Sequence, residues 1–301
     1  MSTAAKPTDQ SKKLKGIVIC LFVYIIALAG GIGIVFYLAF IQWHPIIVAL
    51  IADVAATLIV YAFSMLFSNA SLYDPYWSVI PPFIAFYWLF LETNWDFNVR
   101  KIVVFVLLLI WGARLTYNWL RRWQGLQDVD WRYEKLKNKN PKLFWLTNLL
   151  AIEMLPTTLV FMGCLPLYYI GIASSRLTVL DFAGFTILLA AIIIETVADE
   201  QLARFVKNRQ NKEEEIKIGL WKISRHPNYL GEIMIWWGLF ITCLSTGRSA
   251  LWTIIGPLSI TLLFIFISIP MIEARLETRY LYQFSALSDI CLLYTSPSPR
   301  D

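Results

Sequence analysis

Charged residues, histidine and cysteine are all scarce in this chain of 301 residues. Charged side chains make up 16% of the sequence, and there are two histidines and four cysteines. An ordinary soluble domain has about 25% charged residues, so that class is excluded. Four cysteines without metal-ligand spacing exclude a disulfide scaffold and a zinc site. His44 and His226 lie far apart in the sequence, and we expect no metal centre.

Apolar residues are abundant instead. Hydrophobic residues make up 58% of the chain, and the mean hydropathy is +0.59. A chain this apolar does not stay disordered in water. A bilayer-spanning helix takes about 20 apolar residues, so eight of them would occupy about 160 residues. The net charge of +5 forms no block of one sign that would predict a nucleic-acid partner. The composition therefore predicts a polytopic protein of the lipid bilayer.

Eight apolar segments follow a polar N-terminus, residues 1–15. They cover residues 16–41, 46–67, 79–91, 102–120, 143–173, 178–198, 230–244 and 251–272. We expect an all-α integral membrane bundle of about eight transmembrane helices, within a range of seven to nine. Segment 79–91 is the shortest and begins with two prolines, and segment 143–173 holds Pro156 and Pro166, which favour a kink.

Basic residues gather in two of the loops between these segments. Loops 121–142 and 199–228 hold seven basic residues each, whereas loops 42–45, 174–176 and 245–250 hold almost none. Cytosolic loops carry an excess of Lys and Arg. We therefore expect an even number of spans and a cytosolic N-terminus.

The end of the chain differs from the rest. Residues 291–301, Cys-Leu-Leu-Tyr-Thr-Ser-Pro-Ser-Pro-Arg-Asp, are polar and aperiodic. All eleven match the translation of an adapter that is ligated to fragments in sequencing libraries. We expect residues 291–301 to be adapter read-through rather than native sequence, and the natural C-terminus to be missing.

Three carboxylates lie inside or at the ends of apolar segments, where ionisable groups indicate function by default. Asp53 has the alternative of a neutral, hydrogen-bonded core acid. Glu153 lies one turn before Pro156 and would either satisfy backbone freed by a kink or face a cavity. Glu195 and Asp199 share one helical face. They would repel each other unless a cation or a hydroxyl-rich ligand lay between them, and the alternative is a solvated helix end.

The most informative stretch is residues 219–232, Gly-Leu-Trp-Lys-Ile-Ser-Arg-His-Pro-Asn-Tyr-Leu-Gly-Glu. Pro227 would open the following helix, where its missing N–H costs nothing. Free N–H groups at that start, with Arg225 beside them, would hold an anion such as a phosphate. Asn228 and Glu232 are four apart and face the same way. The alternative is a basic loop against lipid headgroups.

This stretch resembles the C-terminal motif of the steroid 5-alpha-reductase-like superfamily of membrane reductases. It is most similar to a branch with the signature Ser-Arg-His-Pro-Asn-Tyr-x-Gly-Glu. The similarity covers about residues 70–280 and includes five further motifs in order. They are Tyr73-Asp-Pro-Tyr-Trp77, Trp111-Gly-Ala-Arg-Leu115, Asp130-Trp-Arg-Tyr133, Glu195-x-x-x-Asp199-x-Gln201 and Ser268-Ile-Pro-Met-Ile-Glu273.

The apolar segments predict two N-terminal transmembrane helices, residues 16–68, and the resemblance implies a reductase-like membrane domain after them, residues 69–290. That domain would hold NADPH at its cytosolic end, in the endoplasmic reticulum membrane of a eukaryote. A sterol, isoprenoid or fatty-acyl substrate would enter from lipid, and its enone-like C=C bond would be reduced by hydride. The residues implied in cofactor binding are Asp199, Arg225, His226, Asn228, Tyr229 and Glu232.

Two features depart from the steroid reductases. Glu195 stands where they have Asn, and the Glu–Tyr pair that polarises their substrate carbonyl has no clear match in the N-terminal half. The reduction also needs an acid to stabilise the enolate oxygen. The candidates for that acid are Tyr73, Tyr76, Tyr133 and Glu153. We choose Tyr133, which lies beside Arg132 in a segment expected to be cytosolic.

Two other functions remain open. Arg-His-Pro-x-Tyr also occurs in isoprenylcysteine carboxyl methyltransferases and phospholipid N-methyltransferases, which bind S-adenosylmethionine. Those enzymes pair the motif with adjacent Glu-Glu beyond the final span, whereas this chain has Glu273-Ala-Arg-Leu-Glu277. The second alternative is a non-catalytic lipid-binding membrane protein, which the unmatched Glu–Tyr pair keeps open.

Overall fold

The computed structural model describes residues 10–174, 176–209 and 216–275, and every regular element in these ranges is a helix. The expected all-α fold is therefore confirmed for the described residues. The main helices are α1 (Gln10–Phe40), α2 (Pro45–Leu66), α3 (Tyr76–Phe86), α4 (Val99–Arg122), α5 (Trp131–Lys139), α6 (Phe144–Thr147), α7 (Leu155–Ile172), α8 (Val179–Asn208), α9 (Pro227–Leu244) and α10 (Ile255–Leu263). Shorter helical segments are η1 (Ala70–Leu72), η2 (Tyr87–Leu91), η3 (Pro141–Leu143), η4 (Asn148–Met154), η5 (Gly219–Lys222), η6 (Arg248–Ile254) and η7 (Phe264–Ser268). The expected adapter-like tail, residues 291–301, lies outside the described residues.

Five helical stretches among the described residues are long and apolar enough to cross a membrane. They are α1, α2, the run Pro141–Ile172, α8 and the run Arg248–Arg275. The protein is thus a multi-pass membrane protein, while the count of about eight remains a prediction. The other three expected segments are helical but fall short for physical reasons. α3 and η2 together are short, whereas α4 and α9 carry charged or polar side chains such as Arg114 and Glu232.

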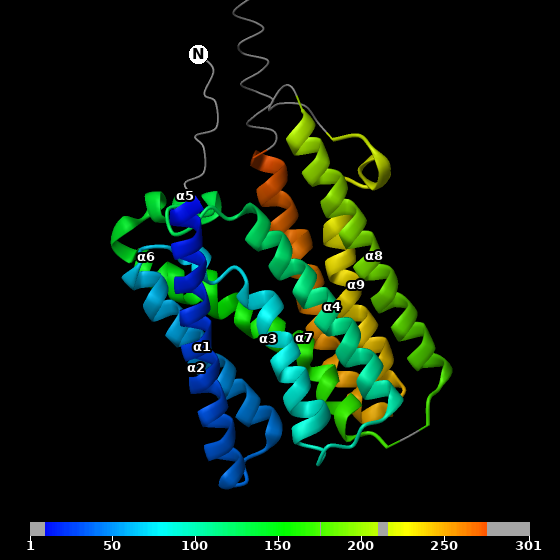
Figure 1. Ribbon diagram of the computed structural model, residues 1–301. Coiled ribbons are helices and arrows are strands. Elements are labelled where there is room, and N and C mark those ends of the chain that lie inside the picture. The colour runs from blue at the N-terminus through cyan, green and yellow to red at the C-terminus, as the bar shows by residue number, and fades with distance from the viewer. Residues whose placement is uncertain (1–9, 175, 210–215, 276–301) are drawn as a thin grey trace, which may run out of the picture.

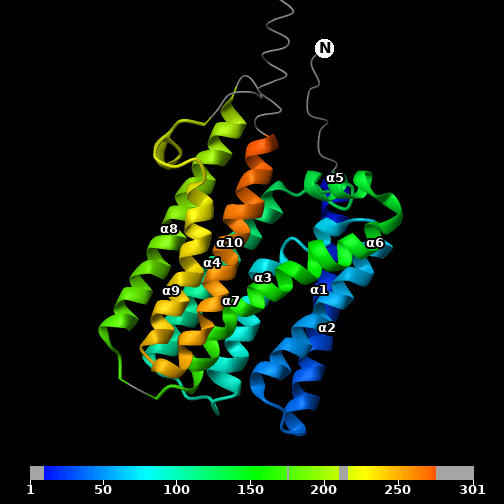
Figure 2. The ribbon, with the colours of Figure 1, turned by 180° about the vertical axis from the view of Figure 1, so that it is seen from behind.

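The helices form two groups joined by a central layer. α1 and α2 make a hairpin along one side, and α8, α9 and α10 lie on the other, with α3, α4 and α7 between them (Figure 1, Figure 2). α8 and α9 approach closely because glycines face the partner helix. A Cβ on Gly231 would lie 2.8 Å from Glu195 Cβ, and one on Gly238 would lie 2.8 Å from Leu188 Cγ. Small residues allow such close packing where lipid supplies no hydrophobic drive between helices.

One end of the bundle collects most of the basic residues. The start of α1, the C-terminal ends of α4 and α8, the start of α9 and all of α5 lie there (Figure 1). We call it the basic end. Both loops that hold seven basic residues begin there, which agrees with the sequence-based sorting of loops. That this end faces the cytosol remains a prediction.

Helix η4 is a π-helix, and it explains the irregularity expected in segment 143–173. It ends at Met154, so Pro156 falls in the first turn of α7 and breaks no hydrogen bond there. The π turn brings together residues five apart, and Asn148 Nδ2 donates to Glu153 Oε1 at 3.2 Å. π turns inside helices often mark functional sites.

Candidate functional site

Arg114 of α4 reaches two carboxylates on α8. Its Nη1 lies 2.8 Å from Asp199 Oδ2, and its Nη2 lies 2.5 Å from Glu195 Oε1. Asn118 Nδ2, one turn further along α4, donates to the same Asp199 oxygen at 2.7 Å. The two acids four apart on α8 therefore do face one way, as the spacing predicts. The cation between them is a side chain of the chain itself.

Glu232 of α9 completes the group. Its carboxylate accepts from Trp111 Nε1 at 3.1 Å and from Trp236 Nε1 at 3.3 Å, and the two indoles meet edge to face. The charge of Arg114 also acts on Glu232, and Glu232 acts on Glu195 across the close α8–α9 contact. We call Arg114, Glu195, Asp199 and Glu232 the acid cluster.

The acid cluster is incomplete as it stands. One guanidinium faces three carboxyls, and Glu195 Oε2 and Arg114 Nε are buried without a hydrogen-bond partner among the described residues. Asn228 Oδ1, one turn before Glu232, is buried and unpartnered within the same ranges. An unsatisfied buried polar group costs about 1–3 kcal/mol. The two orphaned oxygens are acceptors, so they suit a ligand that brings N–H or O–H donors.

The rest of the predicted cofactor residues lie beside this cluster, at the start of α9. Arg225 Nη1 and His226 Nε2 hold the two oxygens of Glu273 at 2.9 and 2.8 Å. The His226 ring stacks on Tyr229 with centroids 5.3 Å apart, and Tyr229 in turn contacts Phe264. Arg225 is 80% exposed, so its second face is open to solvent. A basic pair held by a carboxylate is a position that an anionic group would suit.

Tyr133 lies at the basic end, on α5. Its hydroxyl donates to Asp74 Oδ1 at 2.7 Å. Burial raises the pKa of Asp74 to about 7, although the Tyr133 hydrogen bond and the charge of Arg132 oppose the rise. Burial also holds the pKa of Tyr133 well above its usual range. The charges of Arg132 and Asp130 act on Tyr229, so this segment lies near the start of α9.

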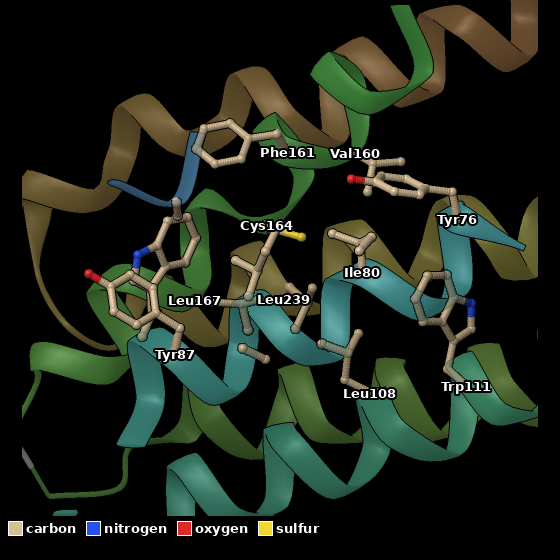
Figure 3. Close-up of a cluster of buried hydrophobic side chains, with 14 of the residues drawn as sticks. Tyr76, Ile80, Tyr87, Leu108, Trp111, Val160, Phe161, Cys164, Leu167 and Leu239 are labelled. Carbon is tan, nitrogen blue, oxygen red and sulfur yellow. The ribbon is translucent and has the colours of Figure 1, made fainter. Parts of the chain in front are cut away.

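The structure also contains a carboxyl–tyrosine pair that the sequence did not reveal. Tyr76 OH on α3 donates to Asp53 Oδ1 on α2 at 2.8 Å, and Asp53 is 4% exposed. Figure 3 shows Tyr76 of α3 and Trp111 of α4 at one end of the same buried cluster. Two signals point to the pair in hindsight. Tyr76 lies in a motif of the resemblance, and Asp53 is an acid in an apolar segment.

The fold and the site define an all-helical, multi-pass membrane protein with a charged cluster buried between three of its helices. The chain belongs to the family described as "Protein of unknown function (DUF1295)", whose model matches residues 60–288. This family is in the steroid 5-alpha-reductase-like group. The matched residues include Tyr76, the acid cluster and residues 219–232, and begin after Asp53.

A curated relative has also been found. The chain is similar to the Uncharacterized protein C594.04c of Schizosaccharomyces pombe, with 23% identity over 243 residues. The aligned part covers 72% of this chain and 70% of the yeast protein. No solved structure matches the chain.

Proposed function

We propose that this protein is an NADPH-dependent membrane oxidoreductase that reduces a C=C bond of a lipophilic substrate. The observation that carries the proposal is the acid cluster with its orphaned acceptors, placed beside the Arg225–His226 pair. The acid cluster has buried acceptors that need hydrogen-bond donors, and the adjacent Arg225–His226 pair suits an anion. A dinucleotide offers both, because its carboxamide and ribose groups donate hydrogen bonds and its phosphates are anionic.

The residues present fit NADPH in these terms. Glu195 Oε2 and Asn228 Oδ1 would accept from carboxamide or hydroxyl groups, and Asp199 and Glu232 would contact the same part of the dinucleotide. Arg225 would turn from Glu273 towards phosphate oxygens, as a guanidinium favours. When bound, NADPH supplies the hydride for the reduction.

The protein must also supply an acid. Hydride addition to an enone-like bond leaves negative charge on the substrate oxygen, and a positioned acid stabilises it. We propose Tyr76 for this role, held by Asp53 of α2, because the pair lies buried at the end of the core that also holds Trp111. Tyr133 remains the candidate from the sequence. It lies instead at the basic end, bound to Asp74.

We further propose that α3 with η2, α4 and α9 also cross the bilayer, which gives eight spans. The basic end would then face the cytosol, and a sterol, isoprenoid or fatty-acyl substrate would enter from lipid. The proposed location is the endoplasmic reticulum membrane. These assignments rest on the loop charges and on the reductases that the chain resembles.

One observation favours a second candidate, an S-adenosylmethionine-dependent methyltransferase. Three carboxyl groups surround one guanidinium in the acid cluster. The sulfonium cation of S-adenosylmethionine would favour their ionised forms and be attracted by them. A non-catalytic lipid-binding protein would require neither ligand.

A thermal-unfolding experiment separates the three functions. The full chain, purified in detergent, is heated alone, with NADPH and with S-adenosylmethionine. A ligand at 100 times its Kd stabilises the folded state by about 2.7 kcal/mol, so NADPH is expected to raise Tm measurably. Stabilisation by S-adenosylmethionine alone would overturn the reductase in favour of the methyltransferase. No response to either ligand would favour the lipid-binding protein.

Glu232→Gln tests the site itself. Loss of a hydrogen bond to a charged group is worth about 1.5–3 kcal/mol, so NADPH affinity is expected to fall about 10- to 100-fold. Glu200→Gln is the matched control, because Glu200 lies beside Asp199 but is exposed and paired with Arg121 and Arg204. Unchanged NADPH affinity in Glu232→Gln would remove Glu232 from the site.

A further inference from the structure

A second polar network lies buried between α2, α3 and α7, and the acid cluster does not use it. Thr57 Oγ1 and Thr157 Oγ1 are 2.9 Å apart, and Tyr73 OH is 2.8 Å from the same Thr157 oxygen. The Thr57 hydroxyl also lies close enough to Tyr76 to act on it. All four side chains are almost completely buried. We call Thr57, Thr157, Tyr73 and Tyr76 the hydroxyl ladder.

An acid lies at each end of the hydroxyl ladder. Asp53 accepts from Tyr76 at one end. At the other end Glu153, one turn before Thr157 on α7, accepts from Ser64 Oγ at 2.6 Å and from Asn148 Nδ2. Asp53 Oδ2 and Glu153 Oε2 are buried and have no hydrogen-bond partner within the described ranges. Polar groups inside a membrane are expensive, and a connected series of them indicates function.

A cavity of about 290 Å³ lies near Ser64, the residue whose hydroxyl donates to Glu153, although neither side chain lines it. Its lining includes Ser68, four residues beyond Ser64, and Phe144, four residues before Asn148. Its polar lining comes mainly from α5, which lies at the basic end: Tyr133, Glu134, Lys137 and Asn138. Ser68 and Ala70 of the lining flank Asn69, whose backbone N–H donates to the Ser64 carbonyl at 2.9 Å, and this contact brings the cavity towards the Glu153 end.

We infer that Glu153 and the hydroxyl ladder form a proton path from this cavity to the Tyr76–Asp53 pair. A hydroxyl group both donates and accepts a hydrogen bond. Each hydroxyl can therefore pass one proton on and take one from its neighbour, with no net change of its own. The step between Glu153 and Thr157 is one helical turn, and in this proposal a water bridges it.

The inference rests on the proposed function only in one respect, namely that the proton delivered to Tyr76 is consumed in the reduction of the substrate. When Tyr76 gives its proton to the reduced substrate, the C–H or O–H bond forms on the substrate and the O–H bond of Tyr76 breaks. Asp53 or Thr57 then reprotonates the Tyr76 phenolate. The path returns one proton from the aqueous cavity, so the side chains end as they began.

Hydrogen–deuterium exchange of the Asp53 carboxyl, followed by infrared spectroscopy, tests the path without any substrate. The C=O band of protonated Asp53 is identified by its loss in Asp53→Asn, and its shift is timed after transfer into D2O. Thr157→Val breaks the ladder at its middle. The exchange is expected to slow at least about tenfold, which corresponds to about 1.4 kcal/mol of added barrier.

Two variants control for folding. Thr157→Ser keeps the hydroxyl and is expected to restore fast exchange. Thr158→Val alters the neighbouring exposed threonine, whose hydroxyl donates to the Met154 carbonyl, and is expected to leave the rate unchanged. Equal exchange in wild type and Thr157→Val, or the absence of an Asp53-dependent acid band, would overturn the path. Slow exchange in Thr157→Val without NADPH binding would support the path and reject only the reductase.

Discussion

Arg100 and Arg114 lie on the same helix, α4, and both meet carboxylates of α8, yet their surroundings differ. Arg100 makes a two-point contact with Asp181, from Nε to Oδ1 at 2.6 Å and from Nη2 to Oδ2 at 3.0 Å. The Thr178 backbone N–H and the Ser245 hydroxyl donate to the same carboxylate. One cation therefore meets one anion, and both oxygens of the anion are satisfied.

The acid cluster at the other end of α4 has the opposite character. Arg114 meets Glu195 and Asp199 directly, and its charge also acts on Glu232. The cluster leaves Glu195 Oε2 and Arg114 Nε without partners among the described residues. Both clusters are thus buried and charged, but they differ in the ratio of carboxyls to cations and in the closure of their hydrogen bonds. The comparison teaches that an open network, rather than a buried charge, is the better sign of a ligand site.

The largest effect is expected from opening the closed cluster. Arg100→Met leaves Asp181 buried without its cation, and the free energy of unfolding is expected to fall by about 3–5 kcal/mol. The double variant Arg100→Met/Asp181→Leu removes both charges and is expected to recover most of that loss. Unfolding in mixed micelles measures both. A double variant as unstable as the single one would contradict a purely structural role.

Removing one acid is expected to act with opposite sign in the two clusters. Asp181→Asn weakens a satisfied pair and should cost about 1–3 kcal/mol. Glu195→Gln relieves repulsion in the acid cluster, and the free protein should be stabilised by up to about 1 kcal/mol, near the net worth of one hydrogen bond. NADPH affinity, measured by thermal shift, should fall in Glu195→Gln and stay unchanged in Asp181→Asn. If Glu195→Gln destabilised the free protein, the predicted difference in sign between the two clusters would be wrong.

A smaller effect is expected at the Arg225–His226 pair, which lies beside the acid cluster and is held by Glu273. Glu273→Gln releases Arg225 and His226, and a surface ion pair is worth only about 0–1 kcal/mol. Stability should therefore change little, while affinity for pyrophosphate should rise because Glu273 no longer competes. Isothermal titration measures the affinity, with Glu134→Gln on α5 as the charge-matched control. Weaker pyrophosphate binding in Glu273→Gln would show that Glu273 positions the pair rather than competing for it.

The last prediction concerns the pH dependence of Asp74, which lies in neither cluster. Burial raises its pKa from 3.8 to about 7 in the folded protein. The folded state therefore favours the protonated acid, so its contribution to stability is complete below pH 4 and is lost as the pH rises towards 7. Tm of the wild type should fall across this window relative to Asp74→Asn. Parallel Tm profiles for the two proteins would contradict the raised pKa.

The helices were largely predictable, because long apolar runs need little besides hydropathy. Segment 16–41 corresponds to α1, and segment 46–67 to α2. Only five stretches of the described residues are both long and apolar enough to cross a membrane. α4 and α9 are not among them, because polar residues of the candidate site replace apolar ones in both helices. α8 also supplies two acids of the cluster, yet it is long and apolar enough to cross a membrane because most of its other residues are apolar.

Contacts between distant segments were not predictable. Arg114 is about 80 residues from its partners on α8, and no periodicity connects α4 with α8. The Asp53–Tyr76 pair was missed for the same reason. Asn148 and Glu153 meet only through a π turn, since residues five apart point to different faces of a regular α-helix. Two local signals succeeded: the shared face at four-residue spacing of Glu195 and Asp199, and Pro227 as the first residue of α9.

The positions of the two arginines on α4 also set a length. Fourteen residues of continuous helix separate Arg100 from Arg114, which is about 21 Å of rise. The hydrocarbon core of a typical bilayer is about 30 Å thick. In the proposed arrangement of eight spans, with Arg100 at one boundary of that core, the acid cluster would lie about 9 Å inside the other boundary, and any tilt of α4 would increase this depth. Bilayer thickness thus becomes a variable of the site, and we expect the protein to be most stable in membranes thinner than average.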